Sequence, residues 1–400
     1  MSAVAARAGE PGTGQTGTGH RSTGRIEVRP FDGDPAQLAD LINLSWQGRY
    51  LARDLIPVYD APGLSWQVLD AGEDSRDFRL AAYDGGRLVG CFLADRLTLR
   101  VGGQIRHGTQ GSYFSVHPDY AACGVATRLI NALERAHRLH GLDFMLGYVN
   151  TASHTPAAQF WTAFQRAFPA RYRALRPVHF WMRFLNARAV AGAMGHPAER
   201  AGLQALSLLQ SALRRLNSEN LSSGHLTFGR GREEVRPYTP ADLPACHLLL
   251  DRAAAHSGLA QLWDASPLAR QLYSPPQFQS HTLVSGPASQ VQGFSNSFSW
   301  PLHSRSSIPA ETIDLLLFDD LTPAARRRLL HATAAASAER GAWLTLAART
   351  DARHAATFLA CGFVPVPQVC TLMMLFPAPD LKFGGLNSDG LHTVGPLRLR

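Results

Sequence analysis

The segment from Ala121 to Thr127 has the residue types and the setting of a phosphate-binding turn. It reads Ala-Ala-Cys-Gly-Val-Ala-Thr and follows residues 112–116, a run of aromatic and hydroxyl side chains that predicts a strand. Apolar residues recur at helical spacing from Val125 to Ala136, so the sequence predicts a helix that Gly124 opens. Backbone N–H groups at a helix start are unpaired and stand at the positive end of the helix dipole, and together these features bind phosphate. An ordinary turn between a strand and a helix has the same residues, so the segment alone leaves both interpretations open.

Two hairpins are expected before this turn. The first joins residues 78–83 to residues 87–94, and the second turns at Gly102-Gly103. An apolar strand over residues 144–149 is expected after the helix. The turn would therefore follow the last strand of an antiparallel meander.

An internal repeat organises the whole chain. Glu27-Val28-Arg29-Pro30-Phe31 recurs as Glu234-Val235-Arg236-Pro237-Tyr238, and each copy leads into a helix start that begins with Pro-Ala. Residues 179–185 and 370–376 form two further similar runs, each predicting a late strand. The sequence therefore predicts two copies of one α+β unit, each with a central mixed, mostly antiparallel sheet flanked by helices. The expected division is a disordered leader (1–24), a first unit (25–190), a linker with a helix (191–233), a second unit (234–378) and an irregular tail (379–400).

Composition narrows the classes of function. The five cysteines are scattered and include no C-x-x-C pair, so the sequence predicts neither a disulfide framework nor a metal site. The net charge of +8 favours an anionic partner, but the arginines are spread along the chain without a nucleic-acid-binding signature. No apolar run reaches the roughly 18 residues of a membrane helix, and the first residues lack a signal core. We therefore expect a cytoplasmic protein with no nucleic-acid or membrane partner.

The segment from Val116 to Ile130 resembles the acyl-CoA-binding motif of the GNAT acyltransferase superfamily, and Ala157-Ala158-Gln159-Phe160-Trp161 resembles its later A-x-x-F-Y helix. The resemblance implies an acyl-CoA cosubstrate. It implies that the backbone N–H groups of Tyr113 and Phe114 hold the thioester oxygen, that Ser115 and Val116 pair with the pantetheine amides, and that Cys123, Gly124, Val125, Ala126 and Thr127 hold the pyrophosphate. Two residues depart from the family pattern: Ala121 replaces an Arg or Gln, and Trp161 replaces the Tyr that protonates the leaving thiolate. An indole N–H cannot serve as that acid.

Three segments resemble the tandem-domain N-myristoyltransferases more closely: residues 112–117, 179–186 and 235–244. In that family the C-terminal carboxylate is the general base, which makes the carboxylate of Arg400 a candidate here. His107, His117, His154, Tyr148 and Asp95 are the alternatives.

The second unit resembles a GNAT domain without a cofactor site. The apolar run 313–318 is followed by Asp319 and Asp320 instead of a glycine turn, and two carboxylates would repel a pyrophosphate. Thr322-Pro323 then predicts a helix start.

The sequence thus predicts an acyl-CoA-dependent N-acyltransferase, with acetyl-CoA as the default donor and a small-molecule or peptide amine as acceptor. A longer acyl donor is the alternative within that class, although Phe114, Phe160 and Trp161 would shorten the acyl cavity. A non-catalytic CoA-binding sensor or scaffold is the alternative from another class, and nucleic-acid binding is a distant third. The identity of the acceptor and the oligomeric state stay open.

Overall fold

A computed structural model describes most of the chain from Ile26 onward. The described residues are 26–50, 55–70, 72–150, 155–195, 197–198, 200–205, 235–273, 280–287, 290–349, 354–366, 370–379 and 381.

The first half contains the two predicted hairpins and the helix that follows the turn at Gly124. Its strands are β1 (Glu27–Pro30), β2 (Ile56–Pro57), β3 (Leu80–Asp84), β4 (Arg87–Val101), β5 (Gln104–Val116), β6 (Phe144–Asn150) and β7 (Tyr172–Phe184). Its α-helices are α1 (Pro35–Tyr50), α2 (Ala61–Leu64), α3 (Val125–Leu139), α4 (Pro156–Ala167) and α5 (Ala187–Ala193), with a π-helical turn at Ser65–Leu69 and 3-10 turns at Glu73–Phe78 and Pro118–Tyr120.

The second half repeats this strand-then-helix plan. Its strands are β8 (Val235–Pro237), β9 (Leu259–Leu262), β10 (Ser280–Ser285), β11 (Gly293–Ser299), β12 (Leu302–His303), β13 (Ser307–Ile308), β14 (Ala310–Leu317), β15 (Leu344–Arg349), β16 (Val364–Pro365) and β17 (Cys370–Leu375). Its helices are a 3-10 turn at Pro240–Asp242, then α7 (Leu243–Ala255), α8 (Ala265–Leu272), α9 (Pro323–Glu339) and α10 (Ala355–Ala360).

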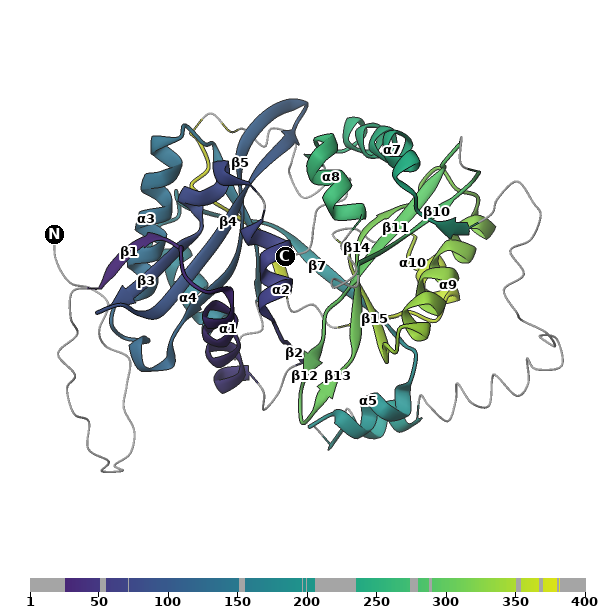
Figure 1. The fold of residues 1–400 in the computed structure, drawn as a ribbon, viewed down its shortest axis with the longest axis horizontal. Coiled ribbons are helices and arrows are strands. Elements are labelled where there is room, and N and C mark those ends of the chain that lie inside the picture. The colour runs from purple at the N-terminus through teal and green to yellow at the C-terminus, as the bar shows by residue number, and fades with distance from the viewer. Residues whose placement is uncertain are drawn as a thin grey trace.

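One sheet runs through both halves. Its strand order is β1-β3-β4-β5-β6-β17-β7-β15-β14-β11-β10-β8, and its pairs are antiparallel except for β5 with β6 and β14 with β15. In Figure 1, β7 runs between the two halves. A mixed, mostly antiparallel sheet flanked by helices is therefore confirmed.

The halves exchange their late strands. β17 lies between β6 and β7 in the first half, while the last part of β7, from His179 to Phe184, pairs with β15 in the second. The two late strands that the sequence predicts are present, and the structure shares them between the halves. The unit boundaries 25–190 and 234–378 stay a prediction. The exchange makes the cores of the two halves depend on each other.

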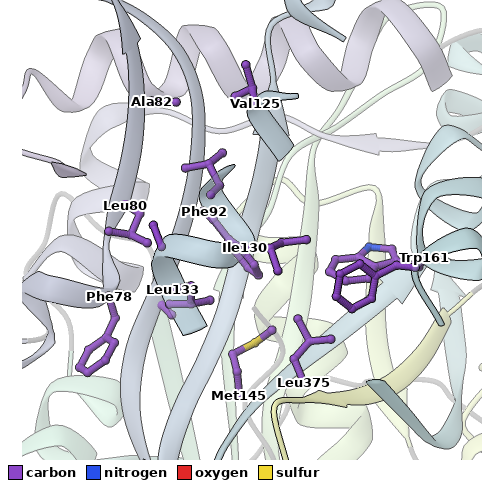
Figure 2. Packing of buried hydrophobic residues seen from close by; sticks show 14 of the residues in the cluster. Phe78, Leu80, Ala82, Phe92, Val125, Ile130, Leu133, Met145, Trp161 and Leu375 are labelled. Atoms are coloured by element: carbon purple, nitrogen blue, oxygen red, sulfur yellow. The ribbon is translucent and has the colours of Figure 1, made fainter. Parts of the chain in front are cut away.

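The core that holds the predicted turn in place lies between helices α3 and α4 and the part of the sheet that belongs to the first half. Figure 2 shows Val125, Ile130 and Leu133 of α3 packed against side chains of the sheet such as Phe92. α3 can approach this closely because Gly90 on β4 has no side chain: a Cβ there would lie 2.7 Å from Cγ1 of Val125. On the opposite face, α1 covers the sheet with a second apolar cluster that includes Leu38, Ile42 and Leu93.

Candidate functional site

The parallel strands β5 and β6 separate partway along their length. They pair from Gly108 with Phe144 to Gly111 with Gly147, and the pairing ends there. β6 continues to Asn150, where it pairs with β17. An opening therefore forms between the second half of β5 and the end of β6.

A bulge in β5 lies beside this opening. Cys91 pairs with Ser115 and Leu93 with Ser112, so Tyr113 and Phe114 both stand opposite Phe92. Tyr113 has φ of 55°, which is uncommon for a residue with a side chain. Its conformation is fixed by contacts on several sides: its carbonyl accepts from the Cys91 thiol at 3.1 Å, its hydroxyl donates to Gln67, and its ring meets Tyr59 edge-on at 5.0 Å.

The predicted phosphate-binding turn is present at the start of α3. Gly124 adopts the left-handed conformation, with φ of 72° and ψ of 12°, and no side chain caps the helix. The N–H groups of Val125, Ala126 and Thr127 have no acceptor among the residues that the structure describes. This helix start thus offers several backbone donors and a positive dipole end.

Cys123 is the exception in the predicted pyrophosphate set. Its N–H donates to the carbonyl of Tyr120 at 3.0 Å, which closes the preceding turn. The backbone donors that remain available in the turn are therefore those after Cys123. The motif alone could not show this, because a turn's internal bonds depend on its conformation.

A cavity of about 320 Å³ connects the helix start with the strand opening. Four predicted site residues line it: Tyr113, Phe114 and Val116 on β5, and Ala126 on α3. Ser115, Cys123, Gly124, Val125 and Thr127 do not line it. The two predicted parts of the site are thus two ends of one space.

Helix α1 contributes two residues that sequence reasoning did not identify. The Ser45 hydroxyl donates to the carbonyl of Val116 at 3.1 Å, and the Trp46 indole N–H donates to Oγ of Ser115 at 2.9 Å. Both line the cavity. Together they fix the stretch of β5 assigned to the pantetheine, and the Ser45 hydroxyl occupies one lone pair of the Val116 carbonyl. No motif marks them, because they meet β5 only in the folded chain.

Aromatic side chains narrow the end of the cavity at the strand opening. Phe114 lies 5.6 Å from Trp161 and 5.7 Å from Phe160, measured between ring centroids. Trp161 is only 6% exposed and belongs to the α3–α4 core while it also lines the cavity. These rings therefore pack against the core and line the cavity at the same time.

The structure separates the candidate bases. Asp95 is buried in an ion pair with Arg79 at 3.4 Å. His107 contacts Thr98 near the turn of the β4–β5 hairpin. The ring of His117 accepts from the N–H of Asp119, and burial together with Arg87 lowers its pKa. None of these three lines the cavity.

Tyr148 is the one candidate base that lines the cavity among the described residues. Burial raises the pKa of its hydroxyl far above the usual value near 10. The hydroxyl therefore stays protonated at neutral pH, which disfavours a role as base. His154 and Arg400 lie outside the described residues.

The equivalent helix start in the second half is filled by the protein itself. β14 and β15 separate after the pair of Ile313 with Ala347, and Thr322 caps α9 by accepting from the N–H of Ala325 at 3.2 Å. Arg326 donates to the carbonyl of Asp319 at 2.5 Å, and the Asp319 carboxylate contacts His354 at 2.5 Å. A phosphate would meet these groups before it reached the helix N–H groups.

Residues 37–165 match the model of the acetyltransferase (GNAT) family. The first half of the chain contains a GNAT domain. No curated protein matches the chain in sequence. A solved structure of N-myristoyltransferase from Saccharomyces cerevisiae with bound myristoyl-CoA is similar to the whole chain, with a TM-score of 0.68 and 14% identity over 95% of this chain and 90% of that one. A second structure of the yeast enzyme, with myristoyl-CoA and inhibitors, gives a TM-score of 0.66 and 14% identity over 95% and 87%.

These likenesses confirm the predicted tandem GNAT-like fold resembling the N-myristoyltransferases. The GNAT domain supports acyl transfer from an acyl-CoA cosubstrate, and its matched range includes the strand opening and the turn at Gly124. None of the helices that the structure describes has the length and apolar character needed to cross a membrane.

Proposed function

We propose that this chain is an acyl-CoA-dependent N-acyltransferase that uses acetyl-CoA or another short acyl-CoA and a primary amine acceptor. The observation that carries the proposal is the single cavity that joins the uncapped start of α3 to the opening between β5 and β6. A diphosphate fits the helix N–H groups, and a pantetheine arm fits a strand edge that has lost its neighbour.

The reaction needs an electrophile held in place and a neutral amine. The amine nitrogen attacks the thioester carbon, the C–S bond breaks, and the thiolate leaves as CoA while the nitrogen loses a proton. Backbone donors at the Tyr113–Phe114 bulge would stabilise the negative charge that develops on the thioester oxygen. The bulge is suited to this because Tyr113 is held rigidly from several sides, so little reorganisation is needed.

A short acyl group suits the size of the cavity. Its volume of about 320 Å³ is at the small end of the roughly 300–1,000 Å³ that is usual for ligand pockets, and it must also admit the pantetheine arm. The rings of Phe114, Phe160 and Trp161 line this cavity and would limit the space for a long acyl chain. The acceptor would be a small-molecule or peptide amine.

The base we propose is the C-terminal carboxylate of Arg400. No histidine or carboxylate is among the cavity-lining residues within the described part of the chain. The lack of a histidine or carboxylate among these described lining residues also favours a second candidate function, a non-catalytic CoA-binding sensor or scaffold.

One experiment separates the two functions. Purified protein is titrated with acetyl-CoA by calorimetry, and release of free CoA thiol is then followed with a panel of peptide, aliphatic and aromatic amines. Amine-dependent thiol release supports the transferase. Binding with no release above the hydrolysis background supports the sensor, and no binding at all would reject both.

A further inference from the structure

Met373 belongs to the second half by sequence but lines the cavity of the first. It is on the exchanged strand β17, opposite Gly147 of β6 and Ala174 of β7. Gly147 is in turn opposite Gly111 of β5, the last pair before β5 and β6 separate. Met373 therefore stands in the row of residues where the strand opening closes.

The Met373 side chain fills this closed end. It is 3% exposed, and its Cε lies 3.2 Å from the position that a Cβ on Gly147 would occupy. It belongs to the same buried cluster as Phe92 and Trp161, and both of these also line the cavity. The thioether thus occupies space above Gly147, beside the pair of glycines that Gly147 of β6 forms with Gly111 of β5.

We propose that Met373 sets the length of acyl group that the site accepts, so that the second half of the chain controls the donor specificity of the first. This inference rests on the proposed function. A methionine side chain is unbranched, and shortening it to alanine removes three heavy atoms at the closed end of the cavity. A longer acyl chain could then occupy that space and bury additional methylene groups.

The next residue on the same strand supplies a matched control. Met374 is fully buried, but it packs with Phe144 and Leu146 in the cluster on the other face of the sheet and does not line the cavity. Met373→Ala and Met374→Ala remove the same atoms from adjacent buried positions. Only the first changes the cavity.

The test measures binding of acetyl-CoA and butyryl-CoA to the wild type and both variants by calorimetry. Each additional buried methylene is worth about fourfold in affinity, so two should raise the butyryl-to-acetyl affinity ratio of Met373→Ala about 15-fold over wild type. Met374→Ala should keep the wild-type ratio. If either alanine variant fails to fold, Met373→Val and Met374→Val replace the pair.

Two results would overturn the inference. An unchanged butyryl-to-acetyl affinity ratio in the Met373 variant would show that the acyl group does not reach this end of the cavity. The proposed function would still stand. An equal rise in both variants shows that loosening of β17, and not the cavity, determines the ratio. Failure of the wild type to bind any CoA thioester would reject the proposed function itself.

Discussion

Replacing Gly124 by Asp and by Asn isolates the effect of charge at the start of α3. Both side chains tolerate the left-handed backbone that Gly124 adopts, with a similar strain of roughly 1 kcal/mol. A Cβ at this position meets no atom within 4 Å, so neither variant should disturb the core. The two variants have nearly the same shape and differ in one negative charge.

The magnitude follows from the distance between like charges. Two unit charges about 4 Å apart repel by about 4 kcal/mol at the effective dielectric constant of a protein surface. An exposed carboxylate can turn away from a bound phosphate, so we take about half of that, ~2 kcal/mol. The predicted effect is a loss of CoA affinity in Gly124→Asp that is about 30-fold greater than the loss in Gly124→Asn.

Calorimetric titration of both variants with CoA measures this difference, with thermal unfolding as the check on folding. Raising the salt concentration should reduce the gap between the variants, because it screens the repulsion. If both folded variants bind CoA as wild type does, the phosphate site is elsewhere. If both variants lose affinity equally, the shape of the side chain at position 124, and not its charge, determines the loss of CoA binding.

Three further predictions follow from the described contacts. CoA should bind at one site per chain, because Arg326, Asp319 and His354 fill the second helix start; a two-site isotherm with one site lost in Asp319→Arg would contradict this. His137 is 1% exposed, its Nε2 contacts Thr109 at 3.0 Å, and its Nδ1 has no partner among the described residues, so burial lowers its pKa to about 4. The unfolded chain then binds the proton more tightly, and the free energy of unfolding should fall by up to about 3 kcal/mol as the pH drops from 6.5 towards 4. Urea unfolding at several pH values should show that the free energy of unfolding falls less steeply with decreasing pH in His137→Phe than in the wild type. Equal pH dependence in the two proteins would refute the assignment of this effect to His137. Deleting Leu399-Arg400, or adding a short C-terminal tag, should reduce turnover by orders of magnitude without loss of CoA binding; wild-type turnover would eliminate the carboxylate as base.

Local sequence patterns were enough to predict the elements around the cofactor turn. The two glycine hairpins, the helix that Gly124 opens and the start of α9 at Pro323 are confirmed. These features arise from interactions over a few residues: glycines adopt positive φ, a threonine side chain caps a helix, and apolar residues recur at the helical period. A short motif therefore sufficed to place the turn.

Contacts between distant parts of the chain decided the rest of the site. Ser45 and Trp46 reach β5 across about seventy residues of sequence. The occupied N–H of Cys123 is a local exception, because it depends on the conformation of a turn that no motif specifies.

The sequence by itself predicted two similar units and a helix start at Gly124 of a kind that can bind phosphate. Only the tertiary structure decided that β17 crosses into the first half and places Met373 at the closed end of its cavity. The physical reason is that a strand's side-chain pattern shows which face is buried but not which neighbour it pairs with. In the folded chain, β17 pairs with the first part of β7 and the last part of β7 pairs with β15, so the complete sheet determines these neighbours.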